Sequence, residues 1–262
     1  MIPRFREGIV ADASFADHFS SGAADYARFR PDYPPVLFEW LAKTVRQRDL
    51  AWDCATGNGQ AAIGLAGHFR QVVATDGSVG QLRAAARNPR VAYASAVAEH
   101  APLGDHSVDL VAVAQALHWF DLGAFYGEVI RVARPRGVIA VWSYGHTSVA
   151  PAIDRIISEF YHDTIGRYWP PGRRHVENGY RDLAFPFASI TAPRFDMLRQ
   201  WGVGELLGYI GTWSAVQRYR KENGDAGVMA FAEALTRAWG NPTVRREVRW
   251  PLTLRVGRIN EE

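Results

Sequence analysis

Asp53, Gly57, Gly59 and Asp76 have the types and the spacing that a nucleoside-binding site needs. The two glycines stand at the fourth and sixth places after Asp53. Because glycine has no Cβ, the backbone at these places can pass close beneath a ligand. Asp53 can accept hydrogen bonds or pair with a cation, and the two carboxylate oxygens of Asp76 suit the vicinal hydroxyls of a ribose. The pattern predicts a site for a nucleoside cofactor.

These residues follow segments that alternate in character along the chain. Apolar runs of strand length occupy residues 49–55, 71–75, 91–97, 108–114 and 137–142, and helical patterns occupy residues 60–68, 78–87 and 121–133. Such alternation predicts βαβ units and a parallel sheet with helices on both faces. The carboxyl ends of parallel strands meet at one edge of the sheet, where ligands bind. We therefore expect Asp53, Asp76, residues 97–99 and residues 114–119 to line one crevice.

The flanking segments predict a lid and a cap. An aromatic-rich helical segment is interrupted by prolines between residues 31 and 35, and residues 204–221 and 225–239 are predicted to form two helices. Alternating apolar residues over 248–256 predict an antiparallel strand. The sequence predicts one domain over the 262 residues of the chain. Its core sheet covers about residues 36–145 and 190–260. The N-terminal lid covers residues 10–34, and the cap helices cover about residues 146–190 and 204–240.

Composition narrows the classes of partner. The net charge is only +3 and basic residues form no long run, so we expect no nucleic-acid partner. We also find no signal-peptide pattern and no apolar run of about 20 residues, so we expect no membrane association. A single cysteine is typical of a reducing compartment, and a cytoplasmic location is expected. We expect no metal site, and the sequence does not indicate an oligomeric state.

Two cofactors remain possible from the turn alone. Gly57-x-Gly59-x-x-Ala62 fits a relaxed dinucleotide fingerprint, in which Asp76 would bind a ribose of NAD. An oxidoreductase of the NAD type is therefore one alternative. Asp53 favours another cofactor, because a carboxylate repels a pyrophosphate and attracts an ammonium group.

Three motifs together resemble the class I S-adenosylmethionine-dependent methyltransferases, specifically the type 11 group. They are the Asp53 to Gly59 turn, Ala98-Glu99-x-x-Pro102 after the third strand, and Pro135-Arg136-Gly137 before the fifth, where the group usually has Pro-Gly-Gly. The resemblance implies an α/β, Rossmann-like, seven-stranded mixed sheet (the class I methyltransferase fold) with a helical cap. It also implies S-adenosylmethionine as cofactor and S-adenosylhomocysteine as product.

Four further segments extend the resemblance to the trans-aconitate methyltransferase-like branch. They are Tyr26-x-x-x-Arg30-Pro31-x-Tyr33-Pro34, residues 115–120 (QALHWF), residues 168–171 (YWPP) and residues 212–215 (TWSA). We expect a small-molecule acceptor, because the cap would enclose a pocket and the sequence has no basic stripe. The likeness to this branch implies that the acceptor is a carboxylic acid.

The resemblance implies a role for each cofactor-binding residue. Asp53 and Gly57 would hold the methionine ammonium, Asp76 the ribose, and Arg30 the methionine carboxylate. Tyr26 would close over the cofactor, and Ala98 and Glu99 would flank the adenine, although Val97 replaces the acidic residue that the family often has there. The full cofactor-binding set is Tyr26, Arg30, Asp53, Thr56, Gly57, Gly59, Gln60, Asp76, Gly77, Ser78, Ala98, Glu99 and Gln115.

The acceptor side is predicted from residues that follow the fourth and fifth strands and from the cap. His118 is the candidate general base, although a structural role is the alternative. The predicted substrate-binding residues are His118, Trp119, Trp142, Tyr144, Trp169 and Trp213. For each of the aromatic residues, core packing is the alternative. A carboxylate could pair with Arg173, Arg174 or Arg218. A catalytically silent cofactor-binding protein is the other alternative for the whole chain.

Overall fold

The computed structural model describes residues 29–259, so Tyr26 and most of the lid expected over residues 10–34 lie outside it. Strands from both halves of the chain form one sheet in the order β3-β2-β1-β4-β5-β8-β6, with β7 also paired to β8. The strands are β1 (Leu50–Cys54), β2 (Gln71–Asp76), β3 (Val91–Ser95), β4 (Val108–Ala114), β5 (Ala133–Tyr144), β6 (Ala188–Ile190), β7 (Phe195–Trp201) and β8 (Arg246–Arg258). Neighbours among β1 to β5 are parallel, and β8 is antiparallel to β5.

The expected mixed Rossmann-like sheet is confirmed, but it has eight strands and not seven. The extra strand arises at the last position of the sheet. There β6 pairs with the end of β8 and β7 pairs with its beginning. Residues 191–194 between them are not in a strand. They include Pro193, which has no N–H to donate to a ladder.

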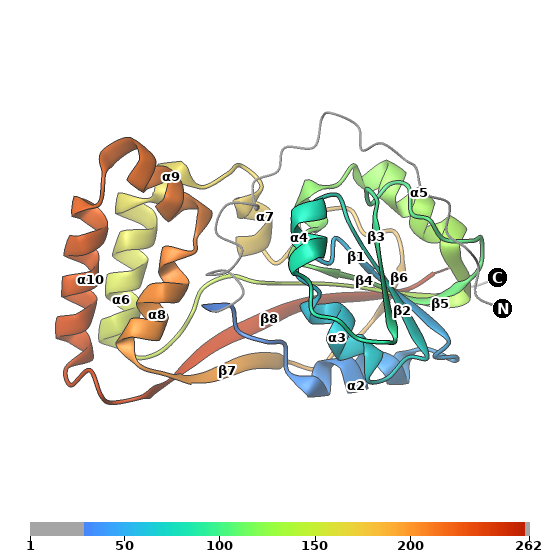
Figure 1. The fold of residues 1–262 in the computed structure, drawn as a ribbon, viewed down its shortest axis with the longest axis horizontal. Helices are drawn as coiled ribbons and strands as arrows, with labels where there is room; N and C mark the ends of the chain where they lie inside the picture. Colours follow the sequence, from blue (N-terminus) through green and yellow to red (C-terminus); the bar gives the residue numbers. More distant parts are fainter. Residues whose placement is uncertain (1–28, 260–262) are drawn as a thin grey trace.

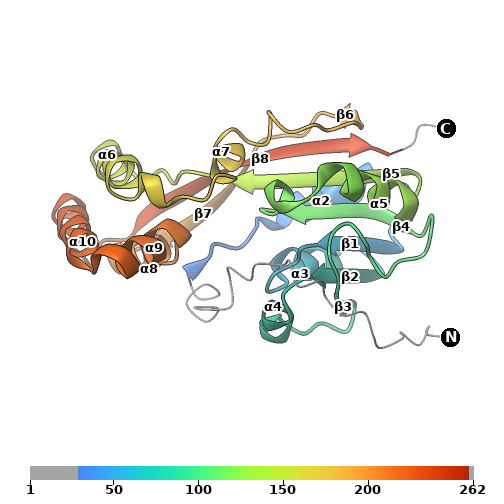
Figure 2. The ribbon, with the colours of Figure 1, turned by 90° about the horizontal axis from the view of Figure 1, so that it is seen from above.

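Helices cover both faces of the sheet because successive strand residues point to opposite sides. Ala51 and Leu110 pack in one buried cluster with helices α2 (Pro35–Thr44) and α3 (Gln60–Ala66). Their neighbours Trp52 and Val111 pack in another cluster with α5 (Leu122–Val132). Figure 1 shows α5 on one side of the sheet and α2 and α3 on the other, and Figure 2, seen from above, shows α4 (Val79–Ala84) near β2 and β3. The strands are therefore buried on both sides, which explains their apolar character.

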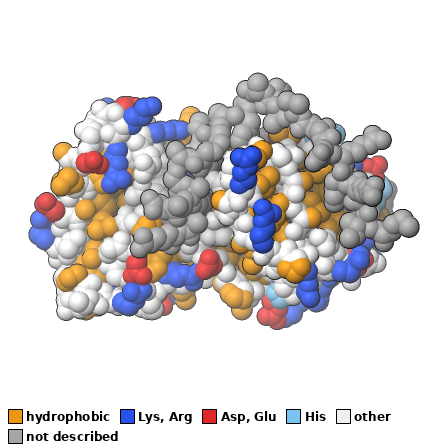
Figure 3. All heavy atoms as spheres, in the orientation of Figure 1, with side chains coloured by type: hydrophobic (Ala, Val, Ile, Leu, Met, Phe, Trp, Pro, Cys, Tyr) orange, Lys and Arg blue, Asp and Glu red, His pale blue; other side chains and the backbone are white. Residues whose placement is uncertain are grey.

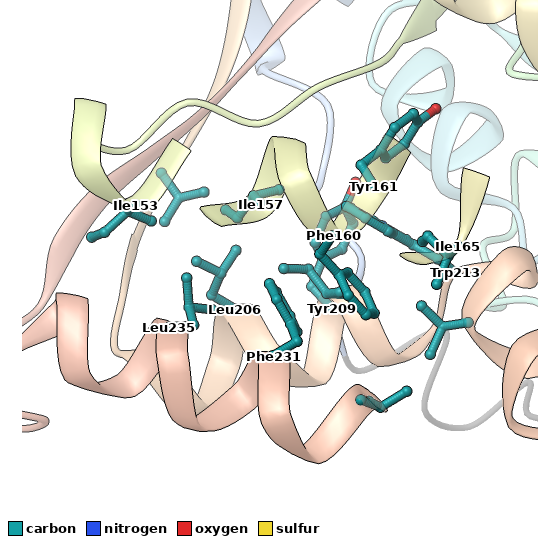
Figure 4. Packing of buried hydrophobic residues seen from close by; sticks show 14 of the residues in the cluster. Ile153, Ile157, Phe160, Tyr161, Ile165, Leu206, Tyr209, Trp213, Phe231 and Leu235 are labelled. Atoms are coloured by element: carbon teal, nitrogen blue, oxygen red, sulfur yellow. The ribbon is translucent and has the colours of Figure 1, made fainter. Parts of the chain in front are cut away.

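The cap lies at one end of the molecule and is tied to the sheet by the long strands β7 and β8 (Figure 1). Its helices are α6 (Pro151–Glu159), α8 (Val203–Gly211), α9 (Ser214–Asn223) and α10 (Ala226–Trp239), with a π-helical turn η2 (Phe160–Thr164) and a 3₁₀ turn η3 (Gly166–Tyr168). Figure 4 shows their shared core, in which the rings of Phe160 and Phe231 stack with centroids 3.9 Å apart. Met197 and Trp250 extend β7 and β8 into this core.

The cap differs from the sequence prediction at one place. A single helix was predicted over 204–221, but the structure has two, α8 and α9. The break falls at Trp213, whose backbone is extended with φ −66° and ψ 134°. The Trp213 ring is buried against Tyr161 and Trp169, so tertiary packing of this side chain decides where the helix is interrupted.

The described surface mixes charges of both signs. Figure 3 shows basic, acidic and apolar side chains interspersed over the face that is not covered by grey residues. Within residues 29–259, no helix has both the length and the apolar character required to cross a bilayer.

Candidate functional site

The turn between β1 and α3 has the backbone geometry of a ligand cradle. Ala55, Gly57 and Gly59 all have positive φ angles, of 55°, 57° and 87°. The Thr56 N–H donates to the Thr75 carbonyl of β2 at 2.9 Å, and the Gly59 N–H donates to the Thr56 carbonyl at 3.0 Å. The turn is therefore tight and is fastened to the neighbouring strand.

Gly59 is required by the shape of this turn. A Cβ built on Gly59 would lie 2.4 Å from the Tyr93 hydroxyl oxygen, which itself donates to the Ala86 carbonyl. We expect Gly59→Ala to lower the free energy of unfolding by about 1–3 kcal/mol, because it adds both a clash and an unfavourable φ. Urea unfolding followed by circular dichroism measures this loss.

Gly67, just after the end of α3, supplies the matched control. Its φ is −69°, and the heavy atom nearest to a Cβ there would be the Gly64 carbonyl oxygen, at 3.5 Å. We expect Gly67→Ala to change the free energy of unfolding by less than about 1 kcal/mol. Equal losses in the two variants would contradict the role given to Gly59.

Asp76 joins the ends of two strands. Its Oδ2 accepts the Gly57 N–H at 2.8 Å, and its Oδ1 accepts the Ser78 N–H at 2.8 Å. Ser78 in turn caps α4 by accepting the Gln81 N–H at 3.4 Å. Each carboxylate oxygen has about two lone-pair directions, so each can accept more than one hydrogen bond. Asp76 thus combines a fixed orientation with acceptors for a diol.

Asp53 lies beneath the turn. It is fully buried, and its Oδ2 accepts the Thr56 hydroxyl hydrogen. Burial raises the pKa of Asp53 from 3.8 to about 7, opposed by the Thr56 hydroxyl and the Ala62 backbone, and the charge of Asp76 adds to the rise. Among the described residues, Oδ1 has no hydrogen-bond partner of ordinary geometry. This buried carboxyl would be stabilised in its charged form by a cation placed above the turn.

A cavity of about 400 Å³ opens beside the turn, at the carboxyl ends of the strands. Most of the predicted site residues line it: Arg30, Thr56, Gly57, Gln60, Asp76, Gly77, Ala98, Glu99, Gln115, Trp119 and Tyr144. Seven do not: Asp53, Gly59, Ser78, His118, Trp142, Trp169 and Trp213. The position of Tyr26 is outside the described residues.

The cavity wall also contains residues that were not predicted as site residues. Among them are Asn58, between the two glycines, and Gln81, one turn into α4. Gln81 follows the Ser78 cap by three residues, and this helical spacing could have placed it on the same side as Gly77. Tyr33 belongs to a motif quoted above, but its role was not predicted.

One wall of the cavity is apolar. Val97, which is 38% exposed, and Ala98 follow β3, Phe120 follows β4, and all three line the cavity. Glu99 has a structural bond, because its Oε1 accepts the Asp121 N–H at the start of α5 at 3.0 Å. This wall can therefore pack against a flat base through side-chain and backbone atoms.

Arg30, Tyr144 and Gln115 close another side of the cavity. The Arg30 Nη1 donates to the Tyr144 hydroxyl at 3.1 Å, and its guanidinium lies 5.4 Å from the Tyr209 ring centroid. Gln115 has a φ of 61°, and its Nε2 donates to the Tyr144 carbonyl at 2.9 Å. The contacts hold a positive charge at the junction of core and cap.

His118 does not line the cavity; it lies in the 3₁₀ turn η1 (Leu117–Trp119). Its Nδ1 lies 3.0 Å from the Tyr180 hydroxyl oxygen. Burial, together with the nearby charges of Arg173 and His175, lowers the pKa of His118 from 6.5 to about 4. The ring is therefore neutral at physiological pH.

The predicted aromatic residues fall into two groups. Trp119, which is 44% exposed, and Tyr144 line the cavity. Trp142 is fully buried within the sheet, and Trp169 and Trp213 pack with Tyr161 in the cap core. For these three, the packing alternative describes the structure better than a substrate wall does.

The residues around the cavity fit a nucleoside cofactor. The turn allows close backbone approach, Asp76 offers acceptors for a diol, and the Val97 wall can receive a base. The buried Asp53, whose pKa is raised to about 7, would be stabilised in its charged form by an ammonium group above the turn. The cavity volume is within the usual range for small-ligand sites, about 300–1,000 Å³.

Comparison with known proteins agrees with this geometry. Residues 52–141 match the model of a family described as a methyltransferase domain. A Dictyostelium discoideum protein named as a methyltransferase is 33% identical over 235 residues, which cover 88% of this chain and 89% of that protein. A Mycobacterium tuberculosis protein named as an uncharacterized methyltransferase is 40% identical over 129 residues, 48% of this chain and 51% of that one. A solved structure described as a type II methyltransferase from Anaeromyxobacter dehalogenans has a TM-score of 0.85 and 46% identity, covering 89% of this chain and 100% of that chain.

Proposed function

The chain belongs to the methyltransferase family, and from this premise we propose that it transfers the methyl group of S-adenosylmethionine to a small carboxylic acid. The observation that supports the cofactor site best is the pairing of Gly57 with Asp76 on one cavity wall. It brings a glycine turn and a diol-binding carboxylate to the same place. This pairing connects the loops after β1 and β2, which are adjacent parallel strands.

We assign the cofactor-binding residues as follows. Asp76 binds the ribose hydroxyls, the turn at Gly57 supports the methionine end, and Arg30 pairs with the methionine carboxylate. Asp53 acts from beneath the turn through its charge, since it is not on the cavity wall. Val97 and Ala98 pack against the adenine. The remaining proposed contacts are Thr56, Gln60, Gly77, Glu99 and Gln115.

The bound cofactor would supply an electrophilic methyl group on a sulfonium centre. The chain's own contribution is position and exclusion of water. Trp119 and Tyr144 line the side of the cavity nearest the cap, where ring faces favour a cation. Well-oriented reacting atoms need little further catalysis, because orientation alone removes a large part of a bimolecular barrier. We also propose that core and cap act as one domain, because β7 and β8 run through both.

The carboxylic acid rests on two observations. The four segments quoted above resemble the trans-aconitate methyltransferase-like branch. In addition, Arg173 lies near His118 and stacks over the Trp169 ring at 4.6 Å. Its Nε donates to the Tyr161 hydroxyl at 2.7 Å, which orients the guanidinium fork. A partly buried arginine with a fixed orientation suits a carboxylate.

Two measurements test this function. In a thermal-shift panel, S-adenosylhomocysteine should raise the melting temperature and NAD should not; the reverse result would favour an oxidoreductase. A radiolabelled methyl-transfer screen over small acids, phenols and amines should then give product with acids. Binding of S-adenosylhomocysteine without transfer to any acceptor would favour a catalytically silent protein. Transfer to phenols or amines alone would remove the carboxylic acid from the proposal.

A further inference from the structure

His118 and Tyr180 form a buried pair beside the cavity. Tyr180 follows helix α7 (Arg173–Glu177), which lies between the core and the cap (Figure 1). The two rings stack with centroids 5.9 Å apart and planes 30° apart, and the hydrogen bond joins Nδ1 to Oη at 3.0 Å. The His118 ring also contacts Trp119, with centroids 4.7 Å apart. Since Trp119 lines the cavity, the pair is one side chain away from the proposed reaction site.

The proton in this hydrogen bond belongs to Tyr180. The Tyr180 side chain is 1% exposed, and burial raises the pKa of its hydroxyl, opposed by Arg173 and by the Leu117 backbone. The phenol therefore stays protonated and must place its hydrogen on an acceptor, because buried hydroxyls are almost always bonded. A backbone group that lowers a phenol's pKa is a donor and cannot take this hydrogen. Among the described residues, the acceptor at hydrogen-bond distance is His118 Nδ1.

The other ring nitrogen then carries the imidazole proton. A neutral imidazole has one N–H, so an Nδ1 that accepts leaves the hydrogen on Nε2. Within residues 29–259, the hydrogen bond that the His118 ring makes is the one at Nδ1.

We infer that Tyr180 fixes His118 as the neutral tautomer protonated on Nε2, so that Nδ1, which accepts the Tyr180 hydroxyl hydrogen, is not available as a general base. Tyr180 is then a positioning residue. The tautomer itself depends only on the hydrogen bond.

The backbone at Tyr180 is constrained in a way that fits this role. Its φ of 60° lies in the left-handed region, which residues with a Cβ rarely adopt. Arg255 of β8 donates to the Tyr180 carbonyl, and the Tyr180 N–H donates to the His175 carbonyl at 2.7 Å. Contacts from a distant strand therefore hold the tyrosine where its hydroxyl reaches His118.

Nitrogen-15 NMR of the ring nitrogens tests the tautomer without any methyl acceptor. The His118 signals are assigned by their loss in His118→Gln. At pH 7 we expect Nε2 to be protonated and Nδ1 to be bare in the full-length protein. In Tyr180→Phe we expect the two tautomers to mix and the pKa of His118 to move towards its ordinary value. Because no methyl transfer is measured, failure of the proposed function would leave this result unaffected.

Tyr126→Phe is the matched control. Tyr126 is 6% exposed and donates its hydroxyl hydrogen to the Ala184 carbonyl at 2.7 Å, away from His118. Its loss should leave the His118 tautomer unchanged. Two results would overturn the inference. One is a hydrogen on Nδ1 of His118 in the wild-type protein, and the other is an unchanged set of His118 ring-nitrogen signals in folded Tyr180→Phe. If Tyr180→Phe does not fold, the wild-type protein decides: a slowly exchanging Tyr180 hydroxyl proton with a cross-peak to the His118 ring supports the inference, and its absence refutes it.

Discussion

Asp76→Ala should weaken the binding of S-adenosylhomocysteine by about 100-fold or more. The expected loss is that of two hydrogen bonds from a diol to a charged acceptor, each about 1.5–3 kcal/mol, where 1.4 kcal/mol is a factor of ten. The variant also loses the bonds that fasten Gly57 and Ser78 to the carboxylate. Isothermal titration calorimetry of the purified variant measures the change, once circular dichroism has shown that it is folded.

Asp105→Ala controls for the loss of a negative charge. The Asp105 side chain is 68% exposed and pairs with Arg131 at 2.5 Å, just before β4 begins and thus away from the strand ends that form the cavity. Its removal should leave the affinity within about twofold of the wild type, since exposed ion pairs contribute about 0–1 kcal/mol. Wild-type affinity in Asp76→Ala would remove Asp76 from the cofactor site.

The second large effect concerns the stability of the ligand-free protein. In the folded state the pKa of Asp53 is raised from 3.8 to about 7, so the folded protein binds this proton more tightly than the unfolded chain does. The resulting stabilisation is fully present below about pH 4 and is lost as the pH rises to about 7. At about 1.4 kcal/mol per pKa unit, the loss amounts to about 4 kcal/mol.

Asp53→Asn should therefore remove this part of the pH dependence. Urea unfolding at pH 5 and pH 8 should show a smaller fall in the free energy of unfolding for the variant than for the wild type. Because His118 and every other titrating group is shared by the two proteins, their contributions cancel in the comparison. Parallel pH dependences would show that Asp53 has an ordinary pKa. Saturating S-adenosylhomocysteine should make the pH dependence of the wild type more like that of the variant, because the ligand's ammonium group favours the charged carboxylate of Asp53.

The sequence was sufficient to predict that Gly57 and Asp76 line one cavity. They come directly after two predicted strands, and parallel strands bring their carboxyl ends to one edge of the sheet. In the structure β1 and β2 are adjacent and parallel, with Asp53 beside Ala74 and Cys54 beside Thr75. The position of these loop residues in the cavity wall was therefore predictable from local reasoning about strands and turns.

The burial of individual side chains could not be predicted from the sequence in the same way. Trp142 and Tyr144 are two residues apart on β5, yet Trp142 is fully buried and Tyr144 lines the cavity. The Tyr33 ring packs edge-on against the Trp142 ring at 5.5 Å and also contacts the Tyr144 ring at 6.5 Å, and Arg30 bonds to the Tyr144 hydroxyl. Both lie more than a hundred residues away in sequence, and local periodicity contains no information about them.

The sequence by itself determined the family, the sheet and the glycine turn with its two acidic residues, because each depends on residue types at short spacing. The tertiary structure alone decided which of the predicted side chains reach the cavity. It placed Asp53 beneath the turn, Trp213 in the cap core, and His118 against Tyr180, 62 positions further along the chain. Burial and hydrogen-bond partners are set by segments that meet only after folding, and they determine which nitrogen of a histidine ring carries the hydrogen.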